Sequence, residues 1–205
     1  MNFRYQKDLF PTKIYHINVK GKNQVFKNYL IPKILDFEKY NNTNPPEAWL
    51  TNKLKTSFDK EYINTTLITE DVCDEYSIQL SRIFGSDLII DFSSFWYNYY
   101  HHGEYQEYHT HLSGGFFEKS CMYSGIHFLS YNSEIHSPVN FLNPIIQNTP
   151  YDISTYYPEI EEGDIIIFPS YLQHSVRPGP PTPEYPRITV AFNFDLKKRE
   201  VECND

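Results

Sequence analysis

The sequence predicts a mainly β protein built as a jelly roll, with amino-terminal helices packed on the strands. Two observations support this prediction. The chain is unusually aromatic, with 18 Tyr and 15 Phe in 205 residues, and such side chains suit half-buried pleated surfaces. Short apolar runs separated by turn-forming residues fill the chain after residue 86, whereas helical spacing occurs before it. We expect one domain over residues 1–205, with an α+β support region at 1–86, a jelly-roll core at 87–196 and a tail at 197–205.

The first third of the chain predicts one strand and two helices. Residues 13–19 alternate apolar and polar side chains, which is typical of a strand. Residues 23–40 carry apolar side chains at mixed helical spacing, and we expect Pro32 to break or kink this helix. A second helix is expected between Thr69, a suitable N-cap, and Gly85, a suitable stop after the last turn.

The rest of the chain predicts eight short strands without an intervening helix. Turn signals such as "HHGE", "LSGG" and "RPGPPTPEYP" separate them. Their expected ranges are 88–100, 105–112, 122–131, 138–142, 151–155, 164–168, 174–177 and 187–196. Eight short antiparallel strands in succession are typical of a double-sheet jelly roll.

Charge and hydropathy exclude several classes of function. Lys and Arg number 18 against 26 Asp and Glu, giving a net charge of −8, which argues against nucleic-acid binding. No apolar run approaches the roughly 18 residues of a membrane-spanning helix, and charges interrupt the amino-terminal segment. We therefore expect a soluble cytoplasmic monomer or homodimer, located in the host cytoplasm if a phage encodes it, with no membrane partner.

Three histidines are the candidate metal ligands. In a strand, residues i and i+2 share a face, so His109 and His111 should project together, with Glu107 in the same row. Such a pair alone is often only two polar side chains on a wet strand. His174 follows the buried strand in "EGDIIIFPSYLQHSV", and a jelly roll would bring it opposite the first two. Three side chains with open positions left over match the facial arrangement of non-haem Fe(II) oxygenases.

A candidate anion site follows at a fixed distance after His174. Arg187 and Thr189 share a strand face in "RITVAFNF". A guanidinium beside a hydroxyl is suited to hold the end carboxylate of a small diacid. An isolated arginine on a strand more often joins a surface ion pair, but its place after a candidate ligand favours binding.

Four segments in this order resemble the 2-oxoglutarate- and Fe(II)-dependent oxygenases. They are "FWYNYYHHGEYQEYHTH", "YSGIHFL", "EGDIIIFPSYLQHSV" and "RITVAFNF". They are most similar to a small group of these proteins that is common in marine bacteria and their phages. The resemblance covers about residues 92–196 and is only loose in the amino-terminal third.

The resemblance implies a double-stranded β-helix that uses Fe(II), 2-oxoglutarate and O2. It implies a dioxygenase that couples decarboxylation of 2-oxoglutarate to oxidation of a small molecule or peptide. Hydroxylation is the expected outcome, and a proline or another amino acid is the first substrate to consider. The implied metal ligands are His109 and His174, with His111 as the second position of the motif; the implied cofactor-binding residues are Arg187, Thr189, Asn98, Trp96 and Asn193.

Two departures from the family pattern leave alternatives open. Most members carry a carboxylate where this chain has His111, so Glu107 or Glu118 could supply one instead. The segment 112–122 is longer than usual and could form a lid. A cupin-type metal enzyme would use His109, His111, Glu118 and His174 without 2-oxoglutarate, but would leave Arg187 without a role. A third alternative is a non-enzymatic jelly roll whose histidines hold a structural metal.

Overall fold

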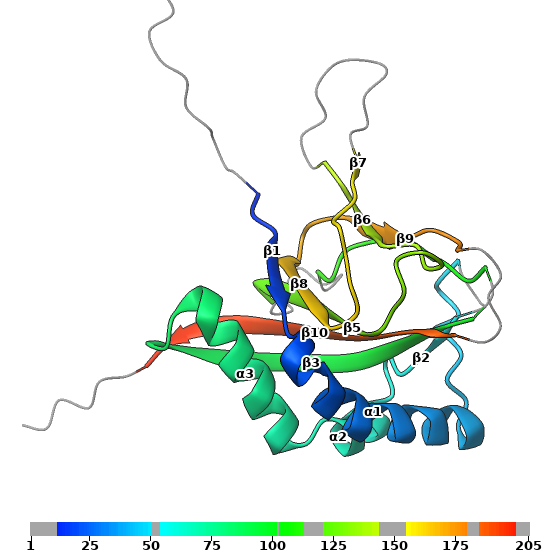
Figure 1. Ribbon diagram of the computed structural model, residues 1–205, viewed down its shortest axis with the longest axis horizontal. Helices are drawn as coiled ribbons and strands as arrows, with labels where there is room; N and C mark the ends of the chain where they lie inside the picture. Colours follow the sequence, from blue (N-terminus) through cyan, green and yellow to red (C-terminus); the bar gives the residue numbers. More distant parts are fainter. Residues whose placement is uncertain are drawn as a thin grey trace, which may run out of the picture.

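The computed structural model of the protein describes residues 12–50, 54–101, 103–112, 121–143, 155–179 and 185–199. Within these ranges three helices and ten strands are present (Figure 1). The helices are α1 (Lys20–Tyr40), α2 (Glu61–Leu67) and α3 (Glu70–Phe84). The strands are β1 (Tyr15–Asn18), β2 (Lys55–Thr56), β3 (Leu88–Tyr100), β4 (Gln106–His109), β5 (Tyr123–Ser130), β6 (Val139–Leu142), β7 (Thr155–Tyr156), β8 (Asp164–Pro169), β9 (His174–Val176) and β10 (Arg187–Lys198).

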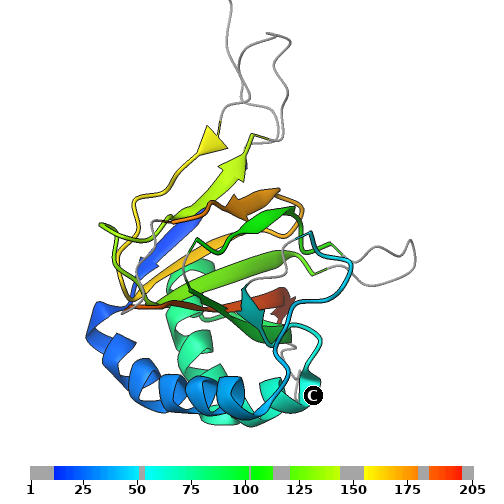
Figure 2. The same cartoon turned by 90° about the vertical axis from the view of Figure 1, so that its right-hand side faces the viewer.

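The elements form three layers. A six-stranded antiparallel sheet, in the order β1-β8-β5-β10-β3-β2, is the middle layer. The helices cover one face of this sheet, and a four-stranded antiparallel sheet, β4-β9-β6-β7, lies on the other side (Figures 1 and 2). The jelly roll with helices packed on it, predicted from the sequence, is confirmed.

Strand β10 shows how alternating side chains separate the layers. Ile188, Val190 and Phe192 belong to the large hydrophobic cluster between the six-stranded sheet and the helices. Because side chains alternate along a strand, Arg187 and Thr189 point to the opposite face, toward the four-stranded sheet. The strand therefore places polar groups in the space between the two sheets.

Part of the space between the two sheets is filled by a second hydrophobic cluster. It contains side chains of β5, β8 and β6 together with loop residues that follow them: Ile126, Phe128, Tyr131, Val139, Phe141, Ile160, Ile166, Phe168 and Leu172. This packed region joins the two sheets. It includes no side chain of β4 or β9, whose adjacent ends carry His109 and His174.

Helix α1 continues through its proline. Pro32 lies inside the helix, which runs from Lys20 to Tyr40, so the expected break is not observed. Leu30 and Ile34, on either side of the proline in sequence, are fully buried. Their burial against the sheet offsets the hydrogen bond that proline cannot donate. Helix α3 runs from Glu70 to Phe84, between Thr69 and Gly85, as predicted.

The strands after residue 86 lie where the sequence predicts them, with shifted ends. Strand β4 ends at His109 rather than at 112, because the N–H of His111 donates to the carbonyl oxygen of Ser170 (3.0 Å). Strand β10 extends to Lys198, two residues into the expected tail. Of the strand expected at 151–155, only Thr155 is described. Helix α2 and strand β2 were not predicted.

None of the helices in the described ranges is long and apolar enough to cross a lipid bilayer.

Candidate active site

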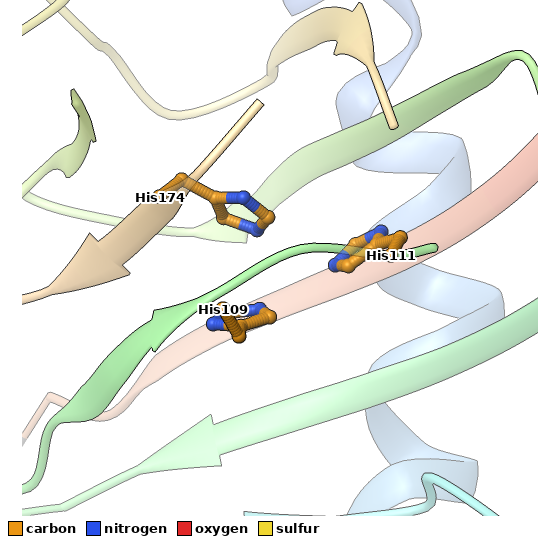
Figure 3. Close-up of side chains that lie close together, drawn as sticks. All are labelled: His109, His111 and His174. Atoms are coloured by element: carbon orange, nitrogen blue, oxygen red, sulfur yellow. The ribbon is translucent and has the colours of Figure 1, made fainter. Parts of the chain in front are cut away.

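Three histidines converge in the space between the sheets. His109 ends β4, His174 begins β9, and the two pair directly across these strands. His111 follows β4 by two residues. The ligand-capable ring nitrogens of the three side chains all lie within 4.8 Å of one another (Figure 3). Among the described residues this is the one group of three or more His, Cys, Asp or Glu side chains that could hold a metal ion.

Hydrogen bonds at Nδ1 orient the rings of His109 and His174. Nδ1 of His109 donates to the carbonyl oxygen of Glu107 (2.8 Å), and Nδ1 of His174 donates to the carbonyl oxygen of Leu172 (3.0 Å). A carbonyl oxygen only accepts, so each Nδ1 carries the proton. The lone pair of each ring is therefore on Nε2, the tautomer that suits a metal ligand.

Side chains of two other strands orient the ring of His111. Its Nδ1 lies 2.9 Å from Oδ1 of Asn193 and 2.8 Å from Oγ of Ser124. The amide of Asn193 is fixed in turn, because its Nδ2 donates to Oγ of Ser94 (3.1 Å). Oδ1 of Asn193 therefore faces the imidazole as an acceptor, and Nε2 of His111 is left free for a metal ion.

Burial keeps the three imidazoles neutral. Desolvation lowers the pKa of His109, lowers that of His174 well below its ordinary value, and lowers that of His111 to about 3. Charge on His109 would further oppose protonation of His111. At neutral pH each ring therefore offers its lone pair without first losing a proton.

Of the two alternative carboxylates, the structure describes only Glu107, and it does not join this group. The carboxylate of Glu107 accepts a hydrogen bond from the N–H of Leu50 (2.8 Å), so it points toward the loop before β2. Glu118 lies outside the described residues, as does most of the segment 112–122, for which a lid was one interpretation. The strand pattern allowed the Glu107 carboxylate to lie beside His109 and His111, but the structure turns it away from them.

A cavity of about 480 Å³ opens beside His109 and His111. Three aromatic rings in contact form its wall: Trp49 lies 5.2 Å from Phe58, and Phe58 lies 5.4 Å from Trp96, between ring centroids. The Trp96 ring is in turn 5.0 Å from that of His111. The candidate metal ligands therefore form one end of a cavity that a substrate side chain could enter.

The predicted anion-binding residues lie deeper, between the sheets. Thr189 pairs with Asn98 and Arg187 pairs with Tyr100 across β10 and β3. Arg187 is 4% exposed, and its guanidinium carbon lies 4.5 Å from the centroid of the Tyr100 ring. It borders a small separate hollow of about 20 Å³ and does not line the histidine cavity.

Several buried polar atoms on this inner face have no hydrogen-bond partner among the described residues. They are Nε1 of Trp96, Oδ1 of Asn98, and Nε and Nη1 of Arg187. An unpaired buried donor costs about 1–3 kcal/mol, and a charged one more. A guanidinium held in this way is suited to a bidentate bond with a carboxylate. Nε and Nη1 of Arg187 are therefore donors still available to an acceptor on this inner face.

Other residues at the site were not identified from the sequence. Trp49 and Phe58 come from the poorly patterned segment before β3, which offered no signal. Ser124 lies in the "SG" pair of "YSGIHFL", which marked the position without revealing its contact with His111. His127, in the same segment as Ser124, is not part of the site. It faces the helices, and Nδ1 of its ring lies 2.9 Å from the hydroxyl oxygen of Tyr76.

The fold and the converging histidines define a double-stranded β-helix with a candidate metal centre. Residues 94–193 match the model of the family described as "Putative 2OG-Fe(II) oxygenase". Over these residues the match confirms the family that the motifs predicted, the 2OG-Fe(II) oxygenases. The family is one of enzymes that use Fe(II), 2-oxoglutarate and O2 on small-molecule or peptide substrates. No sequence among the curated proteins matches this chain.

Solved structures with the same fold include two prolyl hydroxylases. A prolyl-4-hydroxylase from Pseudomonas putida has a TM-score of 0.61 at 13% identity, over 90% of this chain and 92% of that chain. EctD from S. alaskensis has a TM-score of 0.58 at 12% identity, over 90% and 73%. A prolyl hydroxylase from Trichoplax adhaerens, solved with a hypoxia inducible factor peptide fragment, has a TM-score of 0.53 at 13% identity, over 89% and 83%. At these identities the likeness establishes the fold alone.

Proposed function

We propose that this protein is a 2-oxoglutarate- and Fe(II)-dependent hydroxylase whose iron is held by His109, His111 and His174. The observation that carries the proposal is the convergence of three buried imidazoles whose Nδ1 atoms are all occupied by hydrogen-bond partners. Three ligands on one side leave the other coordination positions open, as the chemistry of this family requires. A structural metal would instead take four protein ligands.

Arg187 is proposed to bind the far carboxylate of 2-oxoglutarate. Its two unpaired buried nitrogens need an acceptor, and Thr189, 1% exposed, is next along the same face of β10. Asn98 and Trp96, with one unpaired polar atom each, would line the path between this carboxylate and the metal. Asn193 acts at the other end by orienting His111.

His111 in place of a carboxylate changes the charge of the centre. Three neutral imidazoles leave the metal with one more unit of positive charge than two imidazoles and a carboxylate. This would favour an anionic ligand such as the 1-carboxylate of 2-oxoglutarate. With iron, 2-oxoglutarate and O2 bound, the site would supply an oxidant for a substrate C–H bond, with succinate and CO2 as co-products.

The substrate is proposed to be a proline or another amino acid, free or in a peptide. Two proteins with the same fold are prolyl hydroxylases, and the aromatic wall of Trp49, Phe58 and Trp96 offers flat apolar faces for a small ring or aliphatic side chain.

The test is an anaerobic titration of the iron-loaded protein with 2-oxoglutarate, monitored by the metal-to-ligand charge-transfer band. Wild type should develop the band, and Arg187→Ala should need at least about tenfold more 2-oxoglutarate because the charged pair is lost. Arg82→Ala, an exposed arginine of α3, serves as the matched control and should behave as wild type.

Two results would contradict the proposal. Absence of the band in wild type would favour the cupin-type alternative, in which 2-oxoglutarate has no role. Equal affinity in Arg187→Ala would remove this arginine from the site. A separate variant, His174→Ala, should abolish iron binding, and full occupancy of iron in it would exclude His174 as a ligand.

A further inference from the structure

One edge of strand β3 is largely without a strand partner. On one side β3 pairs with β10 along its whole length, whereas on the other it pairs with β2 only at Asn98 and Tyr99 (Figure 1). Among the described residues, no strand covers the remaining part of that edge. The N–H and C=O of Tyr97 point toward it, because both bond to Ser57. By the two-residue repeat, the N–H and C=O of Phe95 point to the same side.

Two hollows follow this edge and share a border. One is the cavity of about 480 Å³ at His109 and His111, and the other, of about 570 Å³, lies between β3 and α2. Both are lined by the same five residues at their junction: Phe58, Asp59, Ser93, Ser94 and Trp96. Together they make one channel, here called the edge groove, that runs along β3 to the candidate metal centre.

The edge groove is acidic. Asp59 and Glu61 line it and are exposed, and neither forms a salt bridge within the described part of the chain. Glu107 adds a third carboxylate at the cavity end. No lysine or arginine among the described residues lines either hollow, and this includes Lys60, which lies between Asp59 and Glu61 in the sequence.

The turn at the junction holds a residue in a rare conformation. Asp59 has a φ of 59°, in the left-handed region, and the turn is closed by a hydrogen bond from Lys60 N to Ser57 O (3.0 Å). Such conformations are uncommon outside glycine and concentrate at functional sites. Here the turn sets Phe58 and Asp59 side by side at the junction of the two hollows.

We propose that the substrate is an extended, basic segment of polypeptide that adds to the free edge of β3 as a further strand. Main-chain hydrogen bonds to the edge would hold it, and its lysine or arginine side chains would face Asp59 and Glu61. About five residues of an extended chain would span Phe92–Trp96, at roughly 3.3 Å each. The proposal rests on the proposed function, because one side chain of this strand would enter the cavity at His109 and His111.

The test measures binding to metal-free protein without 2-oxoglutarate, by fluorescence anisotropy. The probe is a labelled, capped peptide of about eight residues with a central proline flanked by lysines. One comparison peptide has glutamates in place of the lysines, and another has alternate backbone amides N-methylated so that they cannot pair with an edge. The variant is Asp59→Asn with Glu61→Gln, in which asparagine still tolerates the left-handed conformation. Its matched control is Asp36→Asn with Glu47→Gln, two exposed acids outside the groove.

The lysine peptide should bind wild type and the control variant equally, and the groove variant about tenfold more weakly. The glutamate and N-methylated peptides should bind at least about tenfold more weakly than the lysine peptide. Hydrogen exchange of backbone amides in residues 92–96 should slow when the lysine peptide is bound.

Three outcomes would overturn the proposal: equal binding of the glutamate peptide, undiminished binding of the N-methylated peptide, or no peptide binding either to metal-free protein or to protein loaded with Mn(II) and 2-oxoglutarate. Because the peptide is measured without iron, its failure leaves the 2-oxoglutarate titration unaffected. Failure of that titration in turn leaves peptide binding measurable.

Discussion

At the scale of single residues, Asn193 connects the candidate metal ligands to the six-stranded sheet. Its Oδ1 accepts from Nδ1 of His111, and its Nδ2 donates to Ser94 on the neighbouring strand. The ring of His111 lies beyond the end of β4, so strand pairing does not hold it. Its orientation depends on Asn193 and on Ser124, which also bonds to Asn193 (2.8 Å).

Asn193→Ala should therefore weaken metal binding about tenfold, the usual effect of removing a partner that orients a ligand. Asn193→Asp keeps an acceptor oxygen and should retain most of the affinity. Asn98→Ala, which alters another amide of the same interior, should leave metal affinity unchanged. Titration of metal-free protein with Co(II) measures all three. An unchanged dissociation constant in Asn193→Ala would show that His111 is oriented without it, or is not a ligand.

At the scale of elements, the contact between β5 and β10 requires a glycine. A Cβ added to Gly125 would lie 2.3 Å from the ring of Phe192, which is fully buried. Gly125→Ala should lower the free energy of unfolding by about 1–3 kcal/mol, because the ring has no free space to occupy. Gly21→Ala is the control, since nothing lies within 4 Å of an added Cβ in this helical position.

The control should be neutral or stabilising by up to about 1 kcal/mol. Urea unfolding of both variants provides the measurement. Equal stability of Gly125→Ala and wild type would mean that β5 and Phe192 can separate without cost, contrary to the close packing of this layer.

The layer between the sheet and the helices also contains a buried histidine. His127 of β5 bonds to Tyr76 of α3 and to Asn23 of α1 (3.1 Å). Burial lowers its pKa from 6.5 to about 3. Between about pH 3 and pH 6.5 the unfolded chain therefore binds a proton at His127 that the folded protein does not bind. The contribution of His127 to stability is fully present above pH 6.5 and falls as the pH falls below it, by at most about 1.4 kcal/mol per pH unit.

His127→Gln should lose this part of the pH dependence. Its unfolding free energy should be lower than that of wild type at pH 7, but should fall less steeply between pH 6 and pH 4. His101→Gln, at an exposed position, should keep the slope of wild type. Urea unfolding at several pH values distinguishes the cases, and parallel slopes for His127→Gln and wild type would assign the acid sensitivity to other groups.

The sequence predicted the elements that repeat a clear pattern and missed those that do not. The long strands β3 and β10 and helix α3 have two-residue or helical periodicity and recognisable ends. Helix α2 has seven residues and β2 has two, too few to show a period. Helix α1 continues through Pro32 because Leu30 and Ile34 are buried against the sheet. The sequence of the helix alone does not show what those two side chains pack against.

At the scale of the whole molecule, the candidate site joins the two sheets. His109 and His174 belong to the four-stranded sheet, whereas Asn193 and Arg187 belong to β10 of the six-stranded sheet. The order of motifs along the chain could predict this meeting, because a jelly roll brings those strands face to face. The partners of His111 could not be predicted, since Asn193 lies 82 positions away in sequence and contacts it only through the register of the sheets.

Ligands that bind between the sheets should therefore stabilise the molecule in separable steps, measured as the midpoint of thermal unfolding. Mn(II) replaces Fe(II) to avoid turnover. At about one hundred times its dissociation constant each ligand adds about 2.7 kcal/mol, or roughly 5–10 °C for a chain of this size. We expect Mn(II) to raise the midpoint of wild type, and 2-oxoglutarate to raise it further only when Mn(II) is present.

Three variants separate the two steps. Arg187→Ala should keep the Mn(II) step and lose the 2-oxoglutarate step. His174→Ala should lose both steps, and Arg82→Ala should keep both. A 2-oxoglutarate step of full size in metal-free protein or in His174→Ala would place that ligand away from the three histidines.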